Sequence, residues 1–295
     1  MSVFIGADGG GTKLLLRLEK NGYIIDSRVS AGVNPNDVGY ENSVKKVVSS
    51  MVSLCHENGV KESDVNGIFA GIAGGSTADY ASTLKEKLES VFVNSSCGVS
   101  HDGENIIYAA FPERDGVIVI CGTGSSCFVK SHGVLHRIGG YSTFDMNGSG
   151  YEMGLRAICH TLKSYDGRAE RSLLCSLAEQ KAGGNCIDKL KELLALPKKA
   201  VADYAPLVFE AAEKGDGYAD AIIESSAEYI AESIHAAKRF FDDRFDVVIA
   251  GSVGCDEYMI RKIRRLSSDD ADVSKLEAEP VSGALWKAKQ LADKK

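Results

Sequence analysis

Two glycine-rich segments, more than a hundred residues apart, each follow a short apolar stretch and contain hydroxyl residues. The first follows residues 3–7 and the second follows residues 116–121. They consist of Asp8, Gly9, Gly10, Gly11, Thr12 and Lys13, and of Gly122, Thr123, Gly124 and Ser125. Glycine permits positive φ and a close approach to a bulky anion, while exposed N–H groups and hydroxyls are donors for phosphate oxygens. The pair predicts two matching halves that hold one nucleotide phosphate tail.

Asp8 stands directly before the first glycine run, at the expected end of a strand. Phosphoryl transfer needs charge neutralisation by a metal ion, and a carboxylate there suits Mg²⁺, which is usually held through waters. The alternative interpretation is that Asp8 stabilises the turn through an Asx hydrogen bond. For Thr12, Thr123 and Ser125 the alternatives are a phosphate contact or turn chemistry alone. Lys13 follows a threonine instead of preceding it, so we expect it at the surface or at the edge of the phosphates.

Two common nucleotide-binding motifs do not fit the sequence. No segment matches the Walker A pattern G-x-x-x-x-G-K-[ST]. Gly122-Thr123-Gly124 begins a dinucleotide fingerprint, but Cys127 occupies the third glycine position and the following residues have the pattern of a strand. Nucleotide binding is therefore expected to use a different fold.

The elements that must position these residues alternate between strand and helix patterns. Asn21-Gly22 predicts a hairpin turn and Asn34-Pro35 a loop, while Asp102 is suited to N-cap a following helix. We expect strands at 3–7, 14–18, 23–29, 116–121, 128–130, 135–138 and 247–250, a strand that ends in a glycine turn at 67–75, and a strand end near 99–102. We expect helices at 44–55, 80–91, 104–111, 155–162, 171–179, 187–194, 201–213 and 219–241, and one that begins at 280. This order favours an α/β protein with mixed sheets flanked by helices.

The composition excludes several classes of protein. The net charge is 34 − 41 = −7 without a strong basic run, so nucleic acid is not an expected partner. No apolar run approaches the roughly 20 residues that span a bilayer, and no signal peptide is visible, so no membrane partner is expected. The eight cysteines form no C-x-x-C pair, which favours reduced thiols and a cytoplasmic location.

Taken in order, these motifs resemble the sugar-kinase, actin and heat-shock-chaperone ATPase superfamily. Within it the chain is similar to the branch that contains N-acetylglucosamine kinase and the BadF/BadG/BcrA/BcrD ATPases. The two glycine segments resemble its phosphate loops, residues 249–253 its adenosine-side segment and residues 31–35 a sugar-contacting loop. Residues 205–210 and 280–285 resemble structural helices of the same branch.

The resemblance implies two ribonuclease-H-like (actin-like ATPase) domains, each a mixed five-stranded sheet flanked by helices, with an inter-domain cleft. The first would span residues 1–114 and be joined by the helix at about 280–295, and the second would span 115–279 with a helical insertion. The implied reaction is ATP-dependent, Mg²⁺-assisted phosphorylation of an amino sugar: N-acetylglucosamine, glucosamine or N-acetylmuramic acid. Asp102 would be the general base, with N-capping as its alternative role. We also expect a homodimer.

Further site residues come from the same resemblance. Gly251 and Ser252 would contact the nucleotide, in addition to the two phosphate loops. The sugar-binding set would comprise Asn34, Gly74, Asp102, Gly139, Gly140 and Asp145. Asn34-Pro35 and the glycine pair are otherwise ordinary turn signals.

One segment departs from the family pattern. The branch usually carries Gly-Asp-Glu-Gly-Ser after a glycine pair, whereas residues 144–149 read Phe-Asp-Met-Asn-Gly-Ser. The acid pair is replaced, and either Asp145 or Asn147 is left to contact sugar hydroxyls. Two other classes stay open: an ATPase that activates a 2-hydroxyacyl-CoA dehydratase or benzoyl-CoA reductase, and a binding protein that has lost catalysis. The first would need cysteines for an iron–sulfur cluster.

Overall fold

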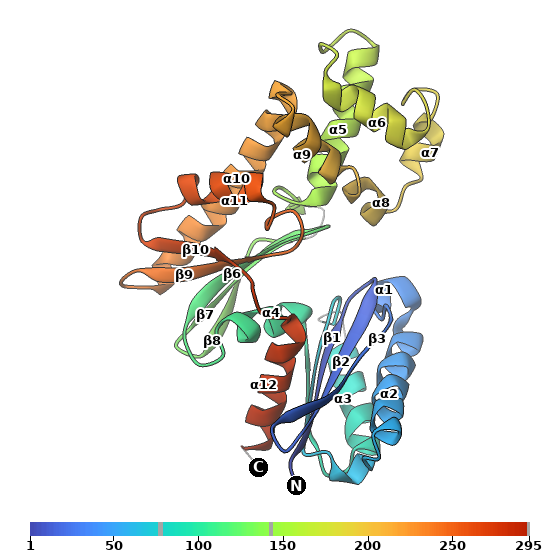
Figure 1. The fold of residues 1–295 in the computed structure, drawn as a ribbon, viewed down its shortest axis with the longest axis vertical. Coiled ribbons are helices and arrows are strands. Elements are labelled where there is room, and N and C mark those ends of the chain that lie inside the picture. The colour runs from blue at the N-terminus through green and yellow to red at the C-terminus, as the bar shows by residue number, and fades with distance from the viewer. Residues whose placement is uncertain (76–78, 142–143, 294–295) are drawn as a thin grey trace. The chain divides into compact units, whose positions relative to one another are not determined.

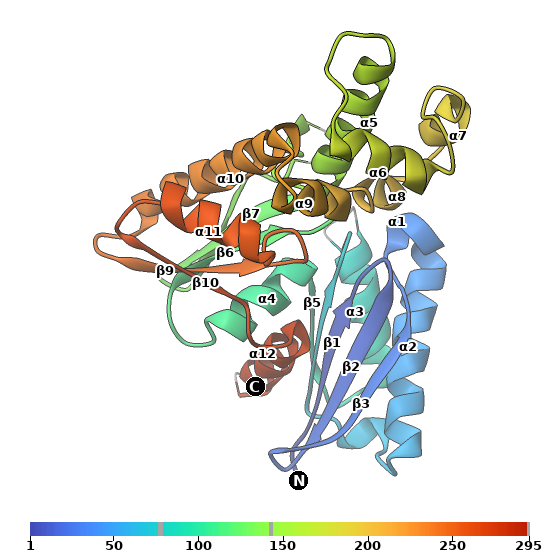
Figure 2. The same cartoon turned by 45° about the horizontal axis from the view of Figure 1, so that its top comes forward.

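The computed structural model describes residues 1–75, 79–141 and 144–293, and the chain divides into two compact units. The first unit contains Met1–Arg114 and Glu277–Lys295, and the second contains Asp115–Leu276. Each unit has its own five-stranded mixed sheet with its own helices (Figures 1 and 2). The predicted α/β class with two such sheets is confirmed.

The sheet of the first unit has the order β3-β2-β1-β4-β5. Its strands are β1 (Val3–Gly9), β2 (Lys13–Lys20), β3 (Tyr23–Ala31), β4 (Gly67–Ile72) and β5 (Ser96–Ser100). The first three form an antiparallel meander, and β4 and β5 run parallel to β1. The β2–β3 turn is the predicted Asn21-Gly22, with φ of 50° and 85°, as a type I′ hairpin requires.

Helices cover both faces of this sheet (Figures 1 and 2). They are α1 (Pro35–Val38), α2 (Tyr40–Glu57), α3 (Tyr80–Val91), α4 (Asp102–Ala110) and α12 (Pro280–Ala292), with a 3₁₀ turn η1 (Glu62–Asp64). The apolar face of α2 is buried with α3 against the strands, which explains its helical spacing of valines. Helix α12 packs against β1, β4 and α4 on the other face. Residues far apart in the sequence thus complete one core.

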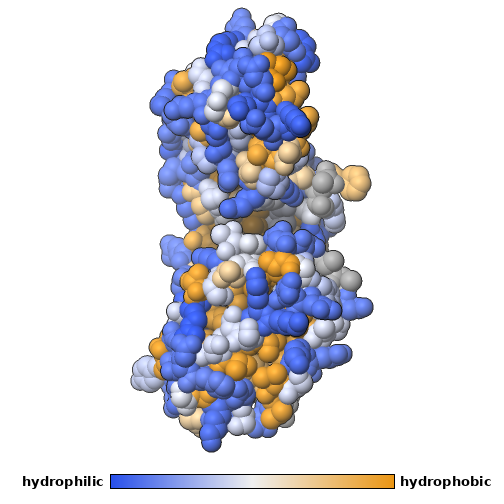
Figure 3. All heavy atoms as spheres, turned by 90° about the vertical axis from the view of Figure 1, so that its right-hand side faces the viewer, coloured by the Kyte–Doolittle hydropathy of each residue, from blue (hydrophilic) through white to orange (hydrophobic). Residues whose placement is uncertain are grey.

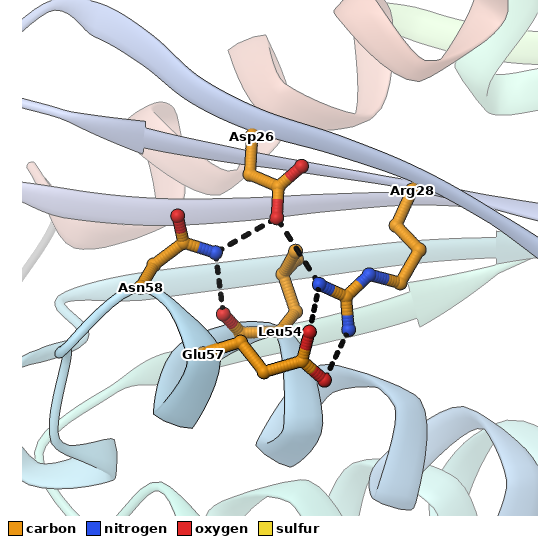
Figure 4. Close-up of polar contacts among 5 residues, drawn as sticks. All are labelled: Asp26, Arg28, Leu54, Glu57 and Asn58. Atoms are coloured by element: carbon orange, nitrogen blue, oxygen red, sulfur yellow. Dashed lines mark hydrogen bonds and ion pairs between the residues drawn. The ribbon is translucent and has the colours of Figure 1, made fainter.

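A polar cluster attaches the edge strand β3 to the end of α2 (Figure 4). Arg28 donates to both carboxylate oxygens of Glu57 at 2.9 and 2.8 Å. Asn58 donates to Asp26 Oδ2 and to the Leu54 carbonyl, both at 2.8 Å. Bidentate Arg–carboxylate pairing is directional, so this cluster fixes the edge of the sheet whose far end carries the first glycine segment.

The sheet of the second unit has the order β10-β9-β6-β7-β8. Its strands are β6 (Gly116–Cys121), β7 (Ser125–Ser131), β8 (Val134–Ile138), β9 (Phe245–Ala250) and β10 (Ala271–Lys275). Here too three antiparallel strands are followed by two parallel ones. Read from the meander edge, the two sheets have the same plan. The β1–β2 and β6–β7 turns therefore occupy equivalent positions in their own units.

The helices of the second unit are α5 (Gly150–Tyr165), α6 (Leu173–Ala182), α7 (Leu190–Leu194), α8 (Lys198–Ala202), α9 (Ala205–Glu213), α10 (Gly217–Ala237) and α11 (Glu257–Leu266), with a 3₁₀ turn η3 (Lys238–Phe240). Helices α5, α6, α9, α10 and α11 form the main core with the sheet, whereas α7 and α8 contribute to a smaller apolar cluster. The carboxylate of Asp216 caps α10 by accepting the N–H groups of Tyr218 and Ala219. This follows the usual preference for aspartate at an N-cap.

The structure differs from several expected elements. Strand β10 and helix α11 were not expected, and the expected helix 201–213 is divided into α8 and α9 near Asp203. The expected helix at 187–194 is only α7, and α10 ends at Ala237, before a 3₁₀ turn. Asn34 does not lie in a plain loop, because its side chain N-caps α1 by accepting the Asn36 N–H.

The surface mixes hydrophilic and apolar side chains, as the face in Figure 3 shows. Exposed large apolar residues include Tyr23 and Val29 of the edge strand β3 and Phe144. Among the described residues no helix is long and apolar enough to cross a bilayer. Scattered apolar residues on a surface are ordinary and carry no conclusion by themselves.

Candidate active site

The first glycine segment is held by neighbouring strand ends of the first unit. Gly10 donates its N–H to the Lys13 carbonyl at 2.8 Å, which closes the β1–β2 hairpin. Val33 N–H donates to the Gly10 carbonyl at 2.9 Å, and Ala73 N–H donates to the Gly9 carbonyl at 2.7 Å. Thr12 and Lys13 are exposed. The hairpin is thus fixed at the carboxyl ends of β1 and β4, the edge of parallel strands where ligands bind in α/β proteins.

The loop glycines do not use positive φ, contrary to the expectation from the sequence, and in the first loop Gly9 and Gly11 are needed for space. None of Gly9, Gly10, Gly11, Gly122 or Gly124 has φ in the left-handed region. A Cβ on Gly9 would lie 2.5 Å from Ile72 Cδ1, and one on Gly11 would lie 2.8 Å from Asp37 Oδ2. Side chains and strand ends pack closely around the first loop, so a glycine is required even with ordinary backbone angles.

Asp8 lies near the end of β1 and is half-buried. Its Oδ1 accepts a hydrogen bond from Asn105 Nδ2 at 2.8 Å. Burial raises the pKa of Asp8 to about 6, the negative charge of Asp102 adds to this rise, and the hydrogen bond from Asn105 and the charge of Lys13 oppose it. A half-buried carboxyl with a second acid nearby is typical of a functional site.

Asp102 begins helix α4, but it does not cap that helix. The N-cap is His101, whose Nδ1 accepts the Gly103 N–H at 3.0 Å. The alternative role of Asp102 as N-cap is therefore wrong. The Oδ1 of Asp102 is buried, lies 2.8 Å from His101 Nδ1, and has no assigned hydrogen bond among the described residues. Such an oxygen is a ready acceptor for a proton.

Asn105 is a residue that the sequence analysis did not identify. It lies one helical turn after Asp102 and is fully buried. Besides Asp8, its Nδ2 approaches the Ala7 carbonyl at 3.0 Å and the Gly71 carbonyl at 3.3 Å. The available signal was an amide in a helical segment next to Ile106 and Ile107, where Asn is not a favoured helix former.

Asn34 and Gly74, two of the expected sugar-binding residues, lie side by side in the first unit. Gly74 has φ of 77°, and a Cβ there would lie 2.7 Å from Asn34 Oδ1. That oxygen already accepts the Asn36 N–H at 3.0 Å. Through Val33 and Ala73 the pair is attached to the first glycine loop. Neighbouring strand ends and loops of the first unit therefore carry the candidate residues, which are Asp8, the first loop, Asn34, Gly74 and Asp102.

The second glycine segment is joined to the beginning of helix α5. Gly122 N–H donates to the Gly124 carbonyl at 2.9 Å and closes the β6–β7 hairpin. The N–H groups of Gly150 and Tyr151 donate to the carbonyls of Gly122 and Thr123 at 2.8 and 3.2 Å. Ser125 donates its hydroxyl to the Asn147 carbonyl at 2.7 Å. Thr123 is exposed, so it is the hydroxyl of this loop that faces solvent.

A cavity of about 230 Å³ lies beside this loop, entirely within the second unit. It joins the second glycine segment to the Gly251-Ser252 segment, which Gly251 brings close by its φ of 92°. Its walls are Gly122, Thr123, Gly150, Ala202, Asp203, Ala205, Pro206, Phe209, Ser252, Val253 and Asp256. The contributions of α5, α8 and α9 were not predicted as nucleotide contacts. The cavity combines loop donors, an apolar wall and the first turn of α5, which suits an anionic ligand with a flat ring.

Gly139, Gly140 and Asp145 form a second turn in the same unit. Both glycines have positive φ, 68° and 73°. Asp145 Oδ2 accepts the Gly140 N–H at 2.6 Å, and Asp145 Oδ1 accepts the hydroxyl of Tyr229. Burial and the neighbouring Asp145 raise the pKa of Tyr229. Asp145 therefore holds the turn in place, and both of its oxygens already have donors.

The metal-binding prediction rests on Asp8 alone. Among the described residues no three His, Cys, Asp or Glu side chains gather into a metal-holding cluster. Mg²⁺ bound with a nucleotide characteristically uses one or two carboxylates, waters and phosphate oxygens. A single half-buried carboxylate beside a phosphate loop fits that mode of binding.

Comparison with known proteins gives a consistent match over nearly the whole chain. Residues 5–286 match the BadF/BadG/BcrA/BcrD ATPase family. The chain is 25% identical to the N-acetylmuramic acid/N-acetylglucosamine kinase of Clostridium acetobutylicum, over 99% of this chain and 100% of that protein. It is 25% identical to the N-acetyl-D-glucosamine kinase of Dictyostelium discoideum, over 84% of each chain.

The fold is similar to a crystal structure of a proposed N-acetylglucosamine kinase from Chromobacterium violaceum. The TM-score is 0.80 at 22% sequence identity, and 98% of each chain is covered. This match extends the fold similarity to both units.

Proposed function

The chain belongs to the BadF/BadG/BcrA/BcrD ATPase family, and from this premise we propose that it is an ATP-dependent amino-sugar kinase. The observation that carries the proposal is the cavity in the second unit. It is lined both by Gly122 and Thr123 and by Ser252, residues that sequence alone had assigned to the nucleotide from two distant segments. The two amino-sugar kinases to which the chain is similar in sequence favour this class over the dehydratase or reductase activator.

The nucleotide would occupy this cavity, with its phosphates toward the β6–β7 turn. Gly122 and Gly124 leave open space there, since the nearest group to a Cβ at either position is Lys198 Nζ, 4.0 Å from Gly124. The first loop, Gly9 to Thr12, would contact the phosphates from the other unit. Bound Mg²⁺–ATP supplies the phosphoryl group and the metal charge that stabilises its transfer.

Asp102 is the proposed general base. Its carboxylate would accept the proton of the sugar hydroxyl as the sugar oxygen bonds to the γ-phosphorus of ATP and the bond from that phosphorus to ADP breaks. Asp8, at the adjacent strand end, would hold Mg²⁺ through waters. Both acids lie in the first unit, so the acceptor must reach the same unit for the proton to be removed.

The acceptor would be N-acetylglucosamine, glucosamine or N-acetylmuramic acid. Asn34 and Gly74 would contact the sugar from the first unit and Gly139, Gly140 and Asp145 from the second. Because both oxygens of Asp145 already accept hydrogen bonds, we propose that it acts by shaping the glycine turn. The replaced acid pair makes the choice of sugar a matter for experiment.

The test is a panel of amino sugars with ATP and Mg²⁺, read by coupled ADP detection. The proposal expects ADP release that depends on an amino sugar, with one of the three named acceptors preferred. Glucose and buffer alone are the controls. Binding of an amino sugar without any ADP release would overturn the kinase proposal and favour a binding protein.

We also propose a homodimer in the cytoplasm. The eight cysteines are free thiols, which suits a reducing compartment. Sedimentation equilibrium of the purified chain tests the dimer, since a monomer and a dimer differ twofold in mass.

A further inference from the structure

Asn105 makes its contacts at the place where the two proposed functional acids meet. It is fully buried in α4, three residues after Asp102, and its Nδ2 lies 2.8 Å from Asp8 Oδ1. The same nitrogen lies 3.0 Å from the Ala7 carbonyl of β1 and 3.3 Å from the Gly71 carbonyl of β4. One side chain therefore links the helix that carries Asp102 to the strand that carries Asp8.

The orientation of this amide is determined by its surroundings. Three oxygens surround Nδ2, so a flipped amide would place Oδ1 against three acceptors. The Oδ1 that results is buried and has no hydrogen-bond partner among residues 1–75, 79–141 and 144–293. The amide therefore faces its acceptors with Nδ2, and its contact with Asp8 is a donated hydrogen bond.

Two glycines allow close packing around Asn105, one beside its side chain and one beside its backbone. A Cβ on Gly71 would lie 2.3 Å from Asn105 Oδ1. A Cβ on Gly283 of helix α12 would lie 2.0 Å from the Asn105 carbonyl oxygen. Strand β4 therefore packs directly against the amide, and helix α12 packs directly against the backbone of α4.

We infer that Asn105 is a positioning residue, which holds the carboxylate of Asp8 in place and fixes its separation from Asp102. The inference rests on the proposed kinase function, because it assigns Asp8 to the metal and Asp102 to the sugar hydroxyl. Charged acids close together repel each other. A neutral amide that donates to one of them, from the helix that carries the other, keeps both in place without adding a positive charge to the site.

The inference predicts that Asn105 affects turnover more than acceptor binding. Asn105→Leu keeps the size of the side chain and removes its donors, and Asn105→Asp also adds a negative charge beside Asp8. We expect kcat to fall about 10-fold for the first and about 100-fold for the second, the range found when a residue that orients a metal-binding group is replaced. The KM for the amino sugar should stay within about threefold.

A matched control separates positioning from folding. Asn66 also uses its side chain on β1, accepting the Val3 N–H at 2.8 Å, but at the opposite end of the strand. Asn66→Asp is the same chemical change and should leave kcat within about twofold. All variants are compared at a temperature where their melting curves show them fully folded.

Mn²⁺ binding in the presence of ADP, followed by electron paramagnetic resonance, gives a readout that needs no acceptor. Asn105→Leu should weaken Mn²⁺ binding several-fold, and Asn66→Asp should not. This arm tests Asn105 even if no amino sugar is phosphorylated, the result that would refute the kinase proposal instead. Folded Asn105→Leu protein with unchanged kcat and unchanged Mn²⁺ affinity would overturn the inference.

Discussion

The β1–β2 and β6–β7 hairpins are built to one plan, yet they hold different residues where the plan coincides. In each, a glycine N–H closes the loop, from Gly10 to Lys13 and from Gly122 to Gly124. Two residues before that N–H stands Asp8 in the first hairpin and Ile120 in the second. At equivalent positions before the two turns, the first unit thus has a carboxylate, Asp8, and the second has an apolar side chain, Ile120.

The space around the two turns also differs. Strand ends and side chains crowd the first turn, whereas the second borders a cavity lined by α5, α8 and α9. The acids Asp8 and Asp102 both belong to the first unit. Under the proposed function, the first unit would carry the proton and metal chemistry, and the second would carry the walls of the nucleotide site.

The largest expected effect concerns the acid that only the first unit has. Asp102→Asn should lower kcat by about 10²–10⁴-fold, the usual contribution of a general base. Sugar-dependent ADP release measures it. The melting temperature should hardly change, because His101 and not Asp102 caps the helix. Glu104→Gln, in the same helical turn, is the control and should retain nearly full activity.

Asp8→Asn should abolish most turnover while stabilising the fold in metal-free buffer. The pKa of Asp8 is raised from 3.8 to about 6, so the folded state binds the proton more tightly than the unfolded state. Native stability therefore falls as pH rises from about 4 to about 6 and stays lower above that range. Asp8→Asn has no carboxyl group to ionise, so its free energy of unfolding at pH 7.5 should exceed that of the unmodified protein by up to about 3 kcal/mol.

The gain should shrink toward pH 4, where Asp8 is protonated in the folded state and about half protonated in the unfolded state. Thermal melts of the two proteins at pH 4, 5, 6 and 7.5 check the sign and the window. A stability difference that is the same at every pH would show that burial of the charge is not its cause.

A matched pair of glycine substitutions tests the difference in crowding. Gly9→Ala would place a Cβ 2.5 Å from Ile72 Cδ1, whereas Gly122→Ala has nothing within 4 Å. Overpacking costs about 1–3 kcal/mol, so Gly9→Ala should lower the melting temperature by several degrees. Gly122→Ala should leave it unchanged and raise the KM for ATP about 10-fold, because the methyl group takes phosphate space. Equal melting temperatures for the two variants would contradict the comparison.

The smallest expected effect on activity concerns the turn of Gly139, Gly140 and Asp145 in the second unit. Tyr229→Phe removes one donor from Asp145, a loss of about 1 kcal/mol for a hydrogen bond. The KM for the amino sugar should rise about threefold with kcat unchanged. Tyr218→Phe, on the same helix, should change neither. A large fall in kcat would give Asp145 a more direct part in the chemistry.

The parts of the fold that sequence predicts are those set by local pattern. The Asn21-Gly22 hairpin and the valine stripe of α2 follow from turn chemistry and helical period. Helix α11 was missed although Met259, Ile260 and Ile263 form its buried face, because four of its ten residues are arginine or lysine and its apolar face is short. Strand β10 was missed because it is a short edge strand with one buried valine, Val273.

The site was predicted where motifs are contiguous and missed where the fold assembles it. The two loops and Asp102 are visible as residues beside strand ends. The sequence suggested Asp102 as a possible N-cap of α4, because aspartate is a preferred N-cap residue. The cap is instead the preceding residue, His101, through its Nδ1. The contacts of Asn105 and the position of α8 and α9 beside the cavity are set by tertiary packing. No local sequence pattern predicts such packing.

Helix α12 has a consequence for how the protein is made. The first unit contains Glu277–Lys295, and the backbone of α12 packs directly on β1 and α4, as Gly6 and Gly283 show. A ribosome delivers the whole second unit before it delivers this helix. The second unit can therefore fold during synthesis, while the acid-bearing half stays open until residues 280–292 emerge. Under the proposed function, a nascent chain could form the nucleotide cavity of the second unit before the unit that carries Asp8 and Asp102 is complete.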